Sequence, residues 1–423
     1  MPDRGSRLTA DVIVVGAGPG GTATAAHLAR DGHDVLVIEK DRFPREKVCG
    51  DGLTPRVVKE LEHLGLGAEA RGEPTGWAVQ KGLRIHGGTT VMELPWPELD
   101  DWPSHGMTCT RRIFDETLAR NAQARGARLW EGTRVTGPIR HPARNDRIMG
   151  VTVETEDGER AEVTAPVVIA SDGAGSGIGK AMGLHRLEGR PMAVAARSYW
   201  ESPASKDDWM SSFLDLQDPD GNLLPGYGWI FPLDDGTINV GLGLLNSARN
   251  FRSVNYRGVL EQWAAGMATE WGTGGEAQRG RIVTSPIPMG FNRVPLHRGG
   301  LLLVGDSGGM VNPFNGEGIS YAMEAGRLAA EVTAEALARS STAVLDRYDA
   351  ELRARWGGYF TLGSVFAELV GNPQVMHLCT TYGMPIRWLM ELVLKLMAHL
   401  TDRRPADAKD AVINTLQRLA PAA

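Results

Sequence analysis

Runs of consecutive apolar residues, each long enough for a buried strand, occur near both ends of the chain. The first run is followed by glycines, by an alanine-rich helical stretch and then by a second apolar run that ends in an acid. A strand, a glycine turn, a helix and a strand in this order are typical of a βαβ unit. The segments that carry this pattern are Asp11–Val15, Thr22–Arg30, Asp34–Glu39, Val167–Ala170 and Leu301–Val304.

The middle of the chain has the pattern of an antiparallel sheet instead. The strand-like segments Tyr227–Pro232 and Thr237–Leu244 are joined by Asp234-Asp235-Gly236, which is a strong hairpin signal. Arg128–Val135 is predicted to form a single further strand. A long helix is predicted over Ile319–Ala338, and the chain beyond it is helical in pattern to its end.

These patterns predict an α/β fold with an α+β insert. We expect a discontinuous Rossmann-type nucleotide-binding domain, an inserted antiparallel-sheet substrate domain and a helical C-terminal region. The predicted nucleotide-binding domain comprises residues 1–75, 111–185 and 285–340, the substrate domain residues 76–110 and 186–284, and the helical region residues 341–423.

Composition narrows the function classes. The 423 residues carry a formal net charge of −6, which argues against a general nucleic-acid binder. The three cysteines are scattered and predict neither a disulfide framework nor a metal site, so a reducing, cytoplasmic setting is expected. No apolar run is long enough to span a membrane. Glycine is the outlier: its 53 residues are nearly twice the usual share of about 7%, which indicates places where the backbone closely approaches another group.

The first glycine turn has the form of a dinucleotide-binding loop, Gly16-x-Gly18-x-x-Gly21, and also contains Gly20. Gly16 permits the tight turn, Gly18 leaves room for a pyrophosphate, and Gly21 lets the helix pack on the strand. Glu39 follows Gly16 by 23 residues, the spacing expected of an acid that binds a ribose hydroxyl. No second loop of this form occurs in the sequence, so no separate nicotinamide domain is predicted.

Later segments point to FAD as the dinucleotide. Gly305-Asp306 after an apolar run, Ser171-Asp172-Gly173 at a strand end and the element Arg111–Asp115 occur in the order found in the p-hydroxybenzoate hydroxylase superfamily, which this sequence resembles. The resemblance implies that Asp306 binds a ribityl hydroxyl and that the helix after Gly318 points at the flavin. Taken alone, Asp172 is equally well explained as a turn or cap residue. The residues assigned to FAD are Gly16, Gly18, Gly20, Gly21, Glu39, Lys40, Cys49, Gly50, Asp51, Gly52, Arg111, Val135, Asp172, Asp306, Gly318 and Ile319.

Within that superfamily the sequence is similar to the geranylgeranyl reductase family. The similarity rests on Cys49-Gly50-Asp51-Gly52, on the Tyr-x-Trp-x-Phe-Pro element at 227–232, and on Asn312-Pro313 leading to Gly316-Glu317-Gly318-Ile319. It covers the chain to about Ala338 and is strongest for the actinobacterial menaquinone reductases. It implies hydride transfer from reduced FAD to an isoprenyl double bond of a prenyl lipid, either a menaquinone side chain or a geranylgeranyl group.

Two other functions stay open. An FAD-dependent monooxygenase or halogenase acting on an aromatic natural product is the main alternative. Against it, Asp306-Ser307-Gly308-Gly309 lacks the histidine of aromatic hydroxylases, and Tyr227 and Phe231 replace the outer Trp and Ile of the halogenase element. A flavoprotein without catalytic activity is the third reading, which so many site-type glycines argue against.

Four residues are candidates for the catalytic site. Tyr227, Trp229 and Phe231 alternate along a strand and should share one face, which we interpret as the wall over the flavin; a plain sheet core is the alternative. Cys49 would shape the flavin site or relay a proton, although an inert buried thiol is equally consistent with its type. We expect Gly226, Gly228, Gly241 and Gly243, in or beside the same hairpin, to open a channel for a long chain.

The helix predicted over Ile386–Leu400 has its polar residues in one narrow stripe: Arg387, Glu391, Lys395 and His399. Such a helix should be covered nearly all round. It fits a C-terminal bundle, and the alternatives are a lid on a lipid tunnel or a peripheral contact with a membrane. The expected partners are a prenyl lipid and an electron donor, for which NADPH, a ferredoxin and another reductase stay open.

Overall fold

A six-stranded sheet forms the centre of the molecule in the computed structural model, which describes residues 8–218, 221–248, 251–402, 404 and 407–423. Its strand order is β19-β20-β13-β2-β3-β9, and all strands except β19 run parallel. The predicted α/β fold is therefore confirmed. The strands are β2 (Val12–Val15), β3 (Val35–Ile38), β9 (Arg128–Trp130), β13 (Val167–Ala170), β19 (His297–Arg298) and β20 (Leu301–Leu303).

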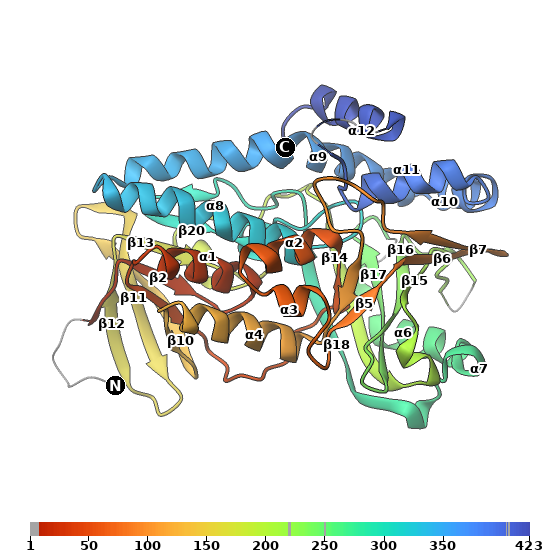
Figure 1. Cartoon of the computed structure of the whole chain (residues 1–423). Coiled ribbons are helices and arrows are strands. Elements are labelled where there is room, and N and C mark those ends of the chain that lie inside the picture. The colour runs from red at the N-terminus through yellow and green to blue at the C-terminus, as the bar shows by residue number, and fades with distance from the viewer. Residues whose placement is uncertain (1–7, 219–220, 249–250, 403, 405–406) are drawn as a thin grey trace.

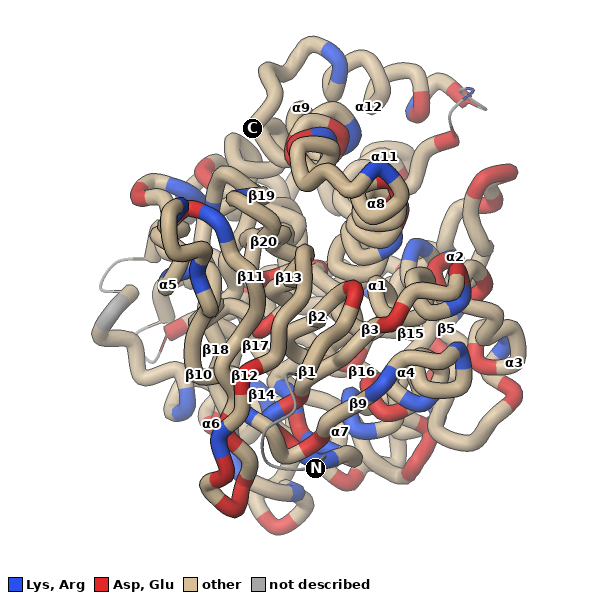
Figure 2. Tube along the Cα trace, turned by 90° about the vertical axis from the view of Figure 1, so that its left-hand side faces the viewer, with Lys and Arg blue, Asp and Glu red and all other residues tan. Residues whose placement is uncertain are grey.

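The central strands are apolar throughout because both faces of this sheet are covered. Val12 and Val14 of β2 face a core built largely from helices, whereas Ile13 and Val15 face a core shared with the strands of a second sheet. That second sheet has the order β1-β12-β11-β10. Its strands are β1 (Leu8–Thr9), β10 (Thr133–His141), β11 (Arg144–Thr155) and β12 (Arg160–Thr164). Figure 2 shows β13, β2 and β3 side by side, with acidic and basic residues interspersed over the segments around them.

The strand predicted over Arg128–Val135 is wrong as a single element. The structure divides it at Glu131 and Gly132, so that β9 extends the central sheet and β10 begins the second sheet. Gly132 has a φ of 64°, a left-handed conformation that glycine adopts readily, and the chain turns there from one sheet to the other. Val135 consequently lies in the second sheet.

The insert predicted to be an antiparallel sheet is a seven-stranded sheet of order β18-β14-β17-β16-β15-β6-β7. Its strand pairs are antiparallel except for β15 and β6, which run parallel, so the prediction is wrong for that pair. The predicted hairpin is its β16–β17 pair, in which Trp229 pairs with Gly241. Figure 1 shows this sheet beside the central one, with α6 and α7 against it. The strands are β6 (Gly82–Gly87), β7 (Thr90–Pro95), β14 (Met192–Glu201), β15 (Trp209–Phe213), β16 (Gly226–Pro232), β17 (Thr237–Leu245) and β18 (Gln278–Pro288).

A separate small sheet has three strands in the order β4-β8-β5. Its β4 (Gly52–Leu53) begins in the Cys-Gly-Asp-Gly turn, and β8 (Gly106–Thr108) pairs with both β4 and β5 (Ala78–Gln80). The helices are α1 (Pro19–Arg30), α2 (Pro55–His63), α3 (Gly67–Ala70), α4 (Arg111–Ala124), α5 (Gly177–Ala181), α6 (Tyr256–Gly266), α7 (Ala268–Trp271), α8 (Ile319–Ala338), α9 (Asp346–Val370), α10 (Pro373–Leu378), α11 (Arg387–Met397) and α12 (Ala408–Leu419).

Two glycines let α1 and α8 approach closely over the central sheet. A Cβ on Gly326 would lie 2.5 Å from the carbonyl oxygen of Gly20, and a Cβ on Gly20 would lie 3.0 Å from the carbonyl oxygen of Ala322 in α8. The pair fixes the start of α8, which has the predicted bounds Ile319–Ala338, against the glycine loop that precedes α1.

The C-terminal helices differ in how they are covered. α9 places Tyr348, Trp356 and Phe360 in the same core as the central sheet. α11 is shorter than predicted, and Ile386 and Trp388 at its start are more than half exposed. The expectation that this helix is covered nearly all round is therefore wrong at its N-terminal end. Within the described part of the chain, no helix combines the length and apolarity of a membrane span.

The predicted polar stripe is divided between two environments. Arg387 and Glu391 form an exposed ion pair at 3.0 Å. Lys395 is buried and lies 2.7 Å from Asp410 of α12, and His399 stacks on Tyr359 of α9 with ring centroids 3.7 Å apart. Glu391 also pairs with Lys409 of α12 at 2.6 Å. The stripe thus joins α11 to α12 and α9, and only Arg387 at its start is largely exposed. The predicted domain boundaries stay predictions.

Candidate functional site

The glycine loop between β2 and α1 is held by contacts with the strand ends beside it. Gly16 has a φ of 95°, and a Cβ there would lie 2.5 Å from the carbonyl oxygen of Ser171. A Cβ on Gly21 would overlap the carbonyl oxygen of Gly16 and the hydroxyl of Ser171. Both positions therefore require glycine, and α1 begins at Pro19 with its N-terminal N–H groups directed at the loop.

Glu39 lies next to this loop, as its spacing from Gly16 predicts. Its Oε2 accepts a hydrogen bond from the Ala17 N–H at 2.9 Å, and its Oε1 accepts one from the Asp41 N–H at 3.1 Å. Arg45 approaches the same carboxylate at 3.4 Å and pairs with Asp115 at 2.8 Å. The acid is thus fixed beside the turn, in the place where a ribose would lie.

The loop residues fit a dinucleotide. A Cβ on Gly18 would meet no atom within 4 Å, although the glycines on either side of it are crowded, so the protein leaves this side of the loop open. The buried Nε of Arg45 lacks a hydrogen-bond partner. The N-terminal N–H groups of α1, the open side of the loop at Gly18 and the unpaired Nε of Arg45 fit the pyrophosphate of a dinucleotide.

A second group of predicted residues meets at the ends of β13 and β20. Asp172 accepts hydrogen bonds from the Ser307 hydroxyl at 3.0 Å and from the Ile178 N–H at 3.2 Å. Asp306 lies in the turn after β20, and a Cβ on Gly318 would lie 3.4 Å from its Oδ1. Asp306 therefore adjoins the N-terminus of α8, which begins at Ile319. Its contact with a ribityl hydroxyl, which the family resemblance implies, stays a prediction.

The Cys-Gly-Asp-Gly turn is fixed to the seven-stranded sheet through Asp51. The carboxylate of Asp51 is fully buried and accepts hydrogen bonds from the Tyr199 hydroxyl and from Asn239 Nδ2, both at 2.8 Å, and from the Arg111 N–H at 3.2 Å. Burial raises the pKa of Asp51 to about 6, although Arg197 and the hydrogen bonds from Asn239 and Tyr199 oppose this shift. The side chain thus bonds to protein, and a cofactor contact through it stays a prediction.

Cys49 lies at the start of the same turn. Its Sγ accepts a hydrogen bond from the Asp51 N–H at 3.4 Å. Burial raises the pKa of the Cys49 thiol, and the nearby guanidinium of Arg111 opposes this only in part. Arg111 itself forms a bidentate pair with Asp115, with both N–O distances 2.7 Å. Cys49 therefore keeps its proton at neutral pH in a site with a fixed cation beside it.

The aromatic row of β16 lies directly on this turn. The rings of Tyr227, Trp229 and Phe231 share one face, with neighbouring ring centroids 6.0 and 6.3 Å apart, which confirms their predicted arrangement. A Cβ on Gly50 would lie 3.2 Å from both Trp229 and Phe231. Trp229 donates to Asn239 at 2.9 Å and Tyr227 donates to the Asn315 carbonyl at 2.6 Å. Asn239 thus joins the row to Asp51, and Tyr227 joins it to the loop before α8.

Tryptophan rings occupy the space beside two of the hairpin glycines. A Cβ on Gly241 would overlap the indole of Trp229, and one on Gly228 would lie 2.7 Å from Trp263. Gly226 lies against the backbone of Gly243. The expectation that these glycines open a channel is wrong, because the space that they leave holds indole rings and backbone.

Two predicted residues lie apart from these groups. Lys40 is exposed and pairs with Asp41 at 3.5 Å. Val135 packs on the core between the central six-stranded sheet and the four-stranded sheet. Arg45, Tyr199 and Asn239 are central to the site and were not predicted. The signal for Asn239 is a single amide within the apolar run of β17, and the signal for Arg45 is its place in a basic loop.

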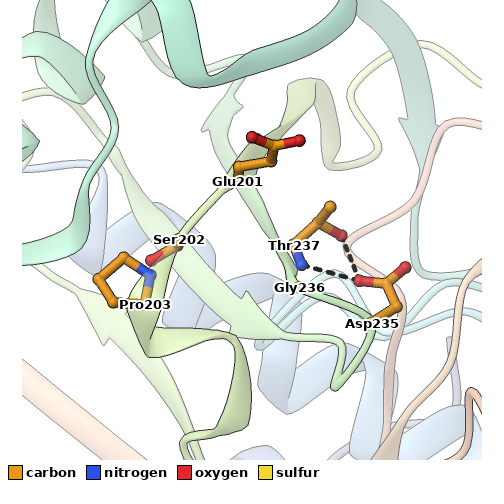
Figure 3. Close-up of a pocket in the computed structure, with 6 residues that line it drawn as sticks. All are labelled: Glu201, Ser202, Pro203, Asp235, Gly236 and Thr237. Atoms are coloured by element: carbon orange, nitrogen blue, oxygen red, sulfur yellow. Dashed lines mark hydrogen bonds between the residues drawn. The ribbon is translucent and has the colours of Figure 1, made fainter.

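A surface hollow lies outside this site. Figure 3 shows it at the ends of β14 and the β16–β17 turn, where Asp235 accepts hydrogen bonds from the backbone and hydroxyl of Thr237 at 2.9 and 2.6 Å. Its lining contains none of the predicted site residues: Glu201, Ser202, Pro203, Asp235, Gly236 and Thr237.

Comparison with known proteins agrees with the geometry. Residues 9–357 match the family model described as an FAD binding domain. The chain is 36% identical over 396 residues to the menaquinone reductase of Mycobacterium tuberculosis, covering 93% of this chain and 91% of that protein. The chain belongs to the geranylgeranyl reductase family of FAD-dependent oxidoreductases. The cofactor that the loop residues fit is therefore FAD.

Other family members extend the likeness. Digeranylgeranylglycerophospholipid reductase of Methanocella arvoryzae is 29% identical over 95% of this chain and 98% of that protein. The solved geranylgeranyl bacteriochlorophyll reductase-like protein of Thermoplasma acidophilum has the same fold, with a TM-score of 0.75 and 22% identity over 97% of this chain and all of that one. Flavin-dependent halogenases share the fold at a lower TM-score of 0.70.

Proposed function

We propose that this FAD-dependent oxidoreductase saturates an isoprenyl double bond of a prenyl lipid, either in a menaquinone side chain or in a geranylgeranyl group. The observation that carries the proposal is the row Tyr227, Trp229 and Phe231, which projects from β16 of the seven-stranded sheet onto the Cys-Gly-Asp-Gly turn. The likeness to a menaquinone reductase and to a geranylgeranyl-lipid reductase supports it.

An isolated trisubstituted alkene has no polar group for an enzyme to bind. FAD, when bound and reduced, supplies the hydride that this reaction needs. The chain would supply the rest: Gly18, Glu39 and Arg45 would hold the nucleotide, and the N-terminus of α8 would hold the flavin part. The aromatic row excludes water and holds the alkene by packing, so that the reacting carbons stay at a fixed distance from the cofactor.

The proton that completes the saturation comes, in this proposal, from the thiol of Cys49. Burial keeps this thiol protonated at neutral pH, and the Arg111 guanidinium beside it stabilises the thiolate that is left after transfer. Cys49→Ala should leave FAD bound and its visible spectrum unchanged, while single-turnover alkene reduction slows by about tenfold or more. An unchanged single-turnover rate removes Cys49 from the reaction.

The deciding experiment for the function is anaerobic. The FAD-loaded protein is reduced with dithionite and mixed with prenyl quinones or with prenyl diphosphates. A product heavier by two hydrogens, formed as the flavin reoxidises, is the expected result. Reoxidation only by oxygen together with an aromatic compound, which gains an oxygen or a halogen, would establish the monooxygenase or halogenase alternative instead.

The same proposal implies a peripheral contact with a membrane. Menaquinones and geranylgeranyl lipids partition into bilayers because their tails are long and apolar. An enzyme without a membrane span among its described helices must then receive such a tail at its surface. The electron donor is not part of the proposal: NADPH, a ferredoxin and another reductase are equally compatible with the residues described here.

A further inference from the structure

The segment from α9 to α11 exposes an unusual number of large apolar side chains. Residues 361–390 contain one acid and one Lys or Arg, Glu368 and Arg387, whereas 23% of the whole chain is charged. Six large apolar or aromatic side chains in this segment are at least half exposed. They form what we term the apolar edge: Val365, Leu369, Leu378, Tyr382, Ile386 and Trp388.

The helices that carry the apolar edge pack on the rest of the protein. α9 is anchored in the central core, and α11 packs on β7. Met384, in the turn before α11, lies against Gly87 at the tip of the β6–β7 hairpin. Figure 1 shows α10 and α11 at one end of the molecule, beside this hairpin. The exposed side chains therefore project from a supported surface.

A cluster rich in methionine connects the edge with the aromatic row. Met384 and Met390 from the C-terminal helices belong to one apolar cluster with Met210 of β15, and Phe231 packs against it. Met210 and Phe231 both lie about 3 Å from the position of a Cβ on Gly52, so the cluster reaches the Cys-Gly-Asp-Gly turn. Methionine side chains are unbranched and rearrange readily to admit an apolar ligand.

We propose that the apolar edge lies on a lipid bilayer and that the prenyl tail enters there, between the β6–β7 hairpin and α11, to reach Phe231. The composition of the edge favours a bilayer as its occupant. Tyr382 and Trp388 combine a large ring with a polar atom, as residues at a membrane surface do, and the edge has no net charge with which to select a charged partner. The route rests on the proposed function, whereas the bilayer contact does not.

The contact is tested by flotation of the full-length, FAD-loaded protein with phosphatidylcholine vesicles. The double variant Ile386→Ser with Trp388→Ser should bind about tenfold more weakly or worse, because two exposed apolar side chains no longer enter the lipid. The control Met149→Ser with Leu187→Ser removes two exposed apolar side chains elsewhere and should bind as the wild type does. Binding should change little between about 0.05 and 0.5 M NaCl, because no net charge is involved.

Three results overturn the contact. The wild type fails to float with the vesicles, or the Ile386 and Trp388 variant floats as well as the control does. In the third, the wild type sediments as a dimer and this variant as a monomer, which makes the edge an interface between two copies of the chain. Retained FAD absorbance and an unchanged far-ultraviolet spectrum show that each variant is folded.

The route is tested by a reversible disulfide across it. A Cβ on Gly87 would lie 3.4 Å from Cγ2 of Thr380 and would displace the flexible end of Met384. The side chains of Gly87→Cys and Thr380→Cys are therefore neighbours, and the pair is tested for disulfide formation. The exposed neighbour Cys379 is first changed to serine. With the disulfide closed, reduction of a long-chain prenyl quinone in vesicles should fall at least tenfold and return on addition of dithiothreitol. The effect on short, water-soluble geranyl diphosphate should be smaller.

The outcomes separate the two proposals. If the wild type reduces no prenyl compound, the proposed function fails while flotation still reports on the bilayer contact. If the disulfide closes and long-chain reduction is unaffected, the tail uses another path and the route is wrong. If the two cysteines do not couple, the hairpin and the turn are not adjacent as required, and the route is equally wrong.

Discussion

The cofactor loops and the C-terminal helices differ in how closely their residues are packed. Around Gly16, Gly21 and Ser171 the backbone is so close that a single added methyl group would overlap a neighbouring atom. At the start of α11, Ile386 and Trp388 are more than half exposed and touch little. In the cofactor loops, neighbouring atoms restrict which residue type fits at each position. At the exposed start of α11, many apolar side chains would fit equally well. Substitutions should therefore be costly in the first region and cheap in the second.

The largest effect is expected at Gly21. Gly21→Ala forces Cβ into the carbonyl oxygen of Gly16, so α1 must shift from β2. The free energy of unfolding should fall by about 3 kcal/mol or more, and the purified protein should lack flavin absorbance. The matched variant is Gly18→Ala, whose methyl group meets open space. It should unfold in urea like the wild type without FAD yet bind FAD at least about tenfold more weakly. Equal loss of stability in both variants would contradict this assignment of the open side.

A smaller effect is expected at Lys395, the buried part of the α11 stripe. Lys395→Met removes the ammonium group 2.7 Å from the fully buried carboxylate of Asp410. Loss of one partner of a buried ion pair costs about 3 kcal/mol or slightly more, because the remaining buried charge loses its nearest opposite charge. Urea unfolding monitored by far-ultraviolet circular dichroism measures the loss. A cost below about 1 kcal/mol would show that this end of α11 is no more constrained than its exposed end.

The pH dependence of stability should report on Asp51. Its pKa is about 6 in the folded protein and about 4 in an unfolded chain. Between these values the folded protein binds the proton more tightly, so stability falls as pH rises from 4 to 6, by about 2–3 kcal/mol in total. Asp51→Asn should lack this component, so that its stability relative to the wild type rises across the window. A constant difference between the two proteins from pH 4 to pH 7 would contradict the assigned pKa.

The smallest effect is expected at Arg387. Arg387→Met breaks an exposed ion pair with Glu391 at 3.0 Å, and such pairs contribute about 0.5 kcal/mol or less. Lys395→Met also replaces a cationic side chain of α11 by methionine, so the two variants form a matched pair within one helix. If the two variants were equally destabilised, burial would not be what distinguishes the two ends of α11.

Much of the cofactor side could be predicted from the sequence because its constraints are local. A glycine loop, the acid 23 residues later and the start of α8 at Ile319 are each defined by a few neighbouring residues, and the structure places them as expected. The division of Arg128–Val135 between two sheets was missed, since both parts have the same alternating pattern and only the partner strands distinguish them.

The catalytic side could be predicted only in part. That Tyr227, Trp229 and Phe231 share a face follows from the two-residue repeat of a strand. That Gly241 accommodates Trp229, and that Asn239 joins this ring to Asp51, depends on the register of β16 against β17 and on how the turn after Cys49 meets that sheet. These contacts join residues up to 190 positions apart in the sequence, between Cys49 and Asn239.

The sequence by itself determined the fold class, the cofactor and the family, because close packing of backbone against backbone leaves few residue types at positions such as Gly16 and Gly21. The tertiary structure decided which polar residues are buried together and which apolar residues stay outside. Asp51, Tyr199 and Asn239 acquire their roles only when the turn packs on the sheet. Which apolar side chains form the apolar edge, Trp388 among them, is decided only by the packing of the core, because the core leaves these side chains exposed.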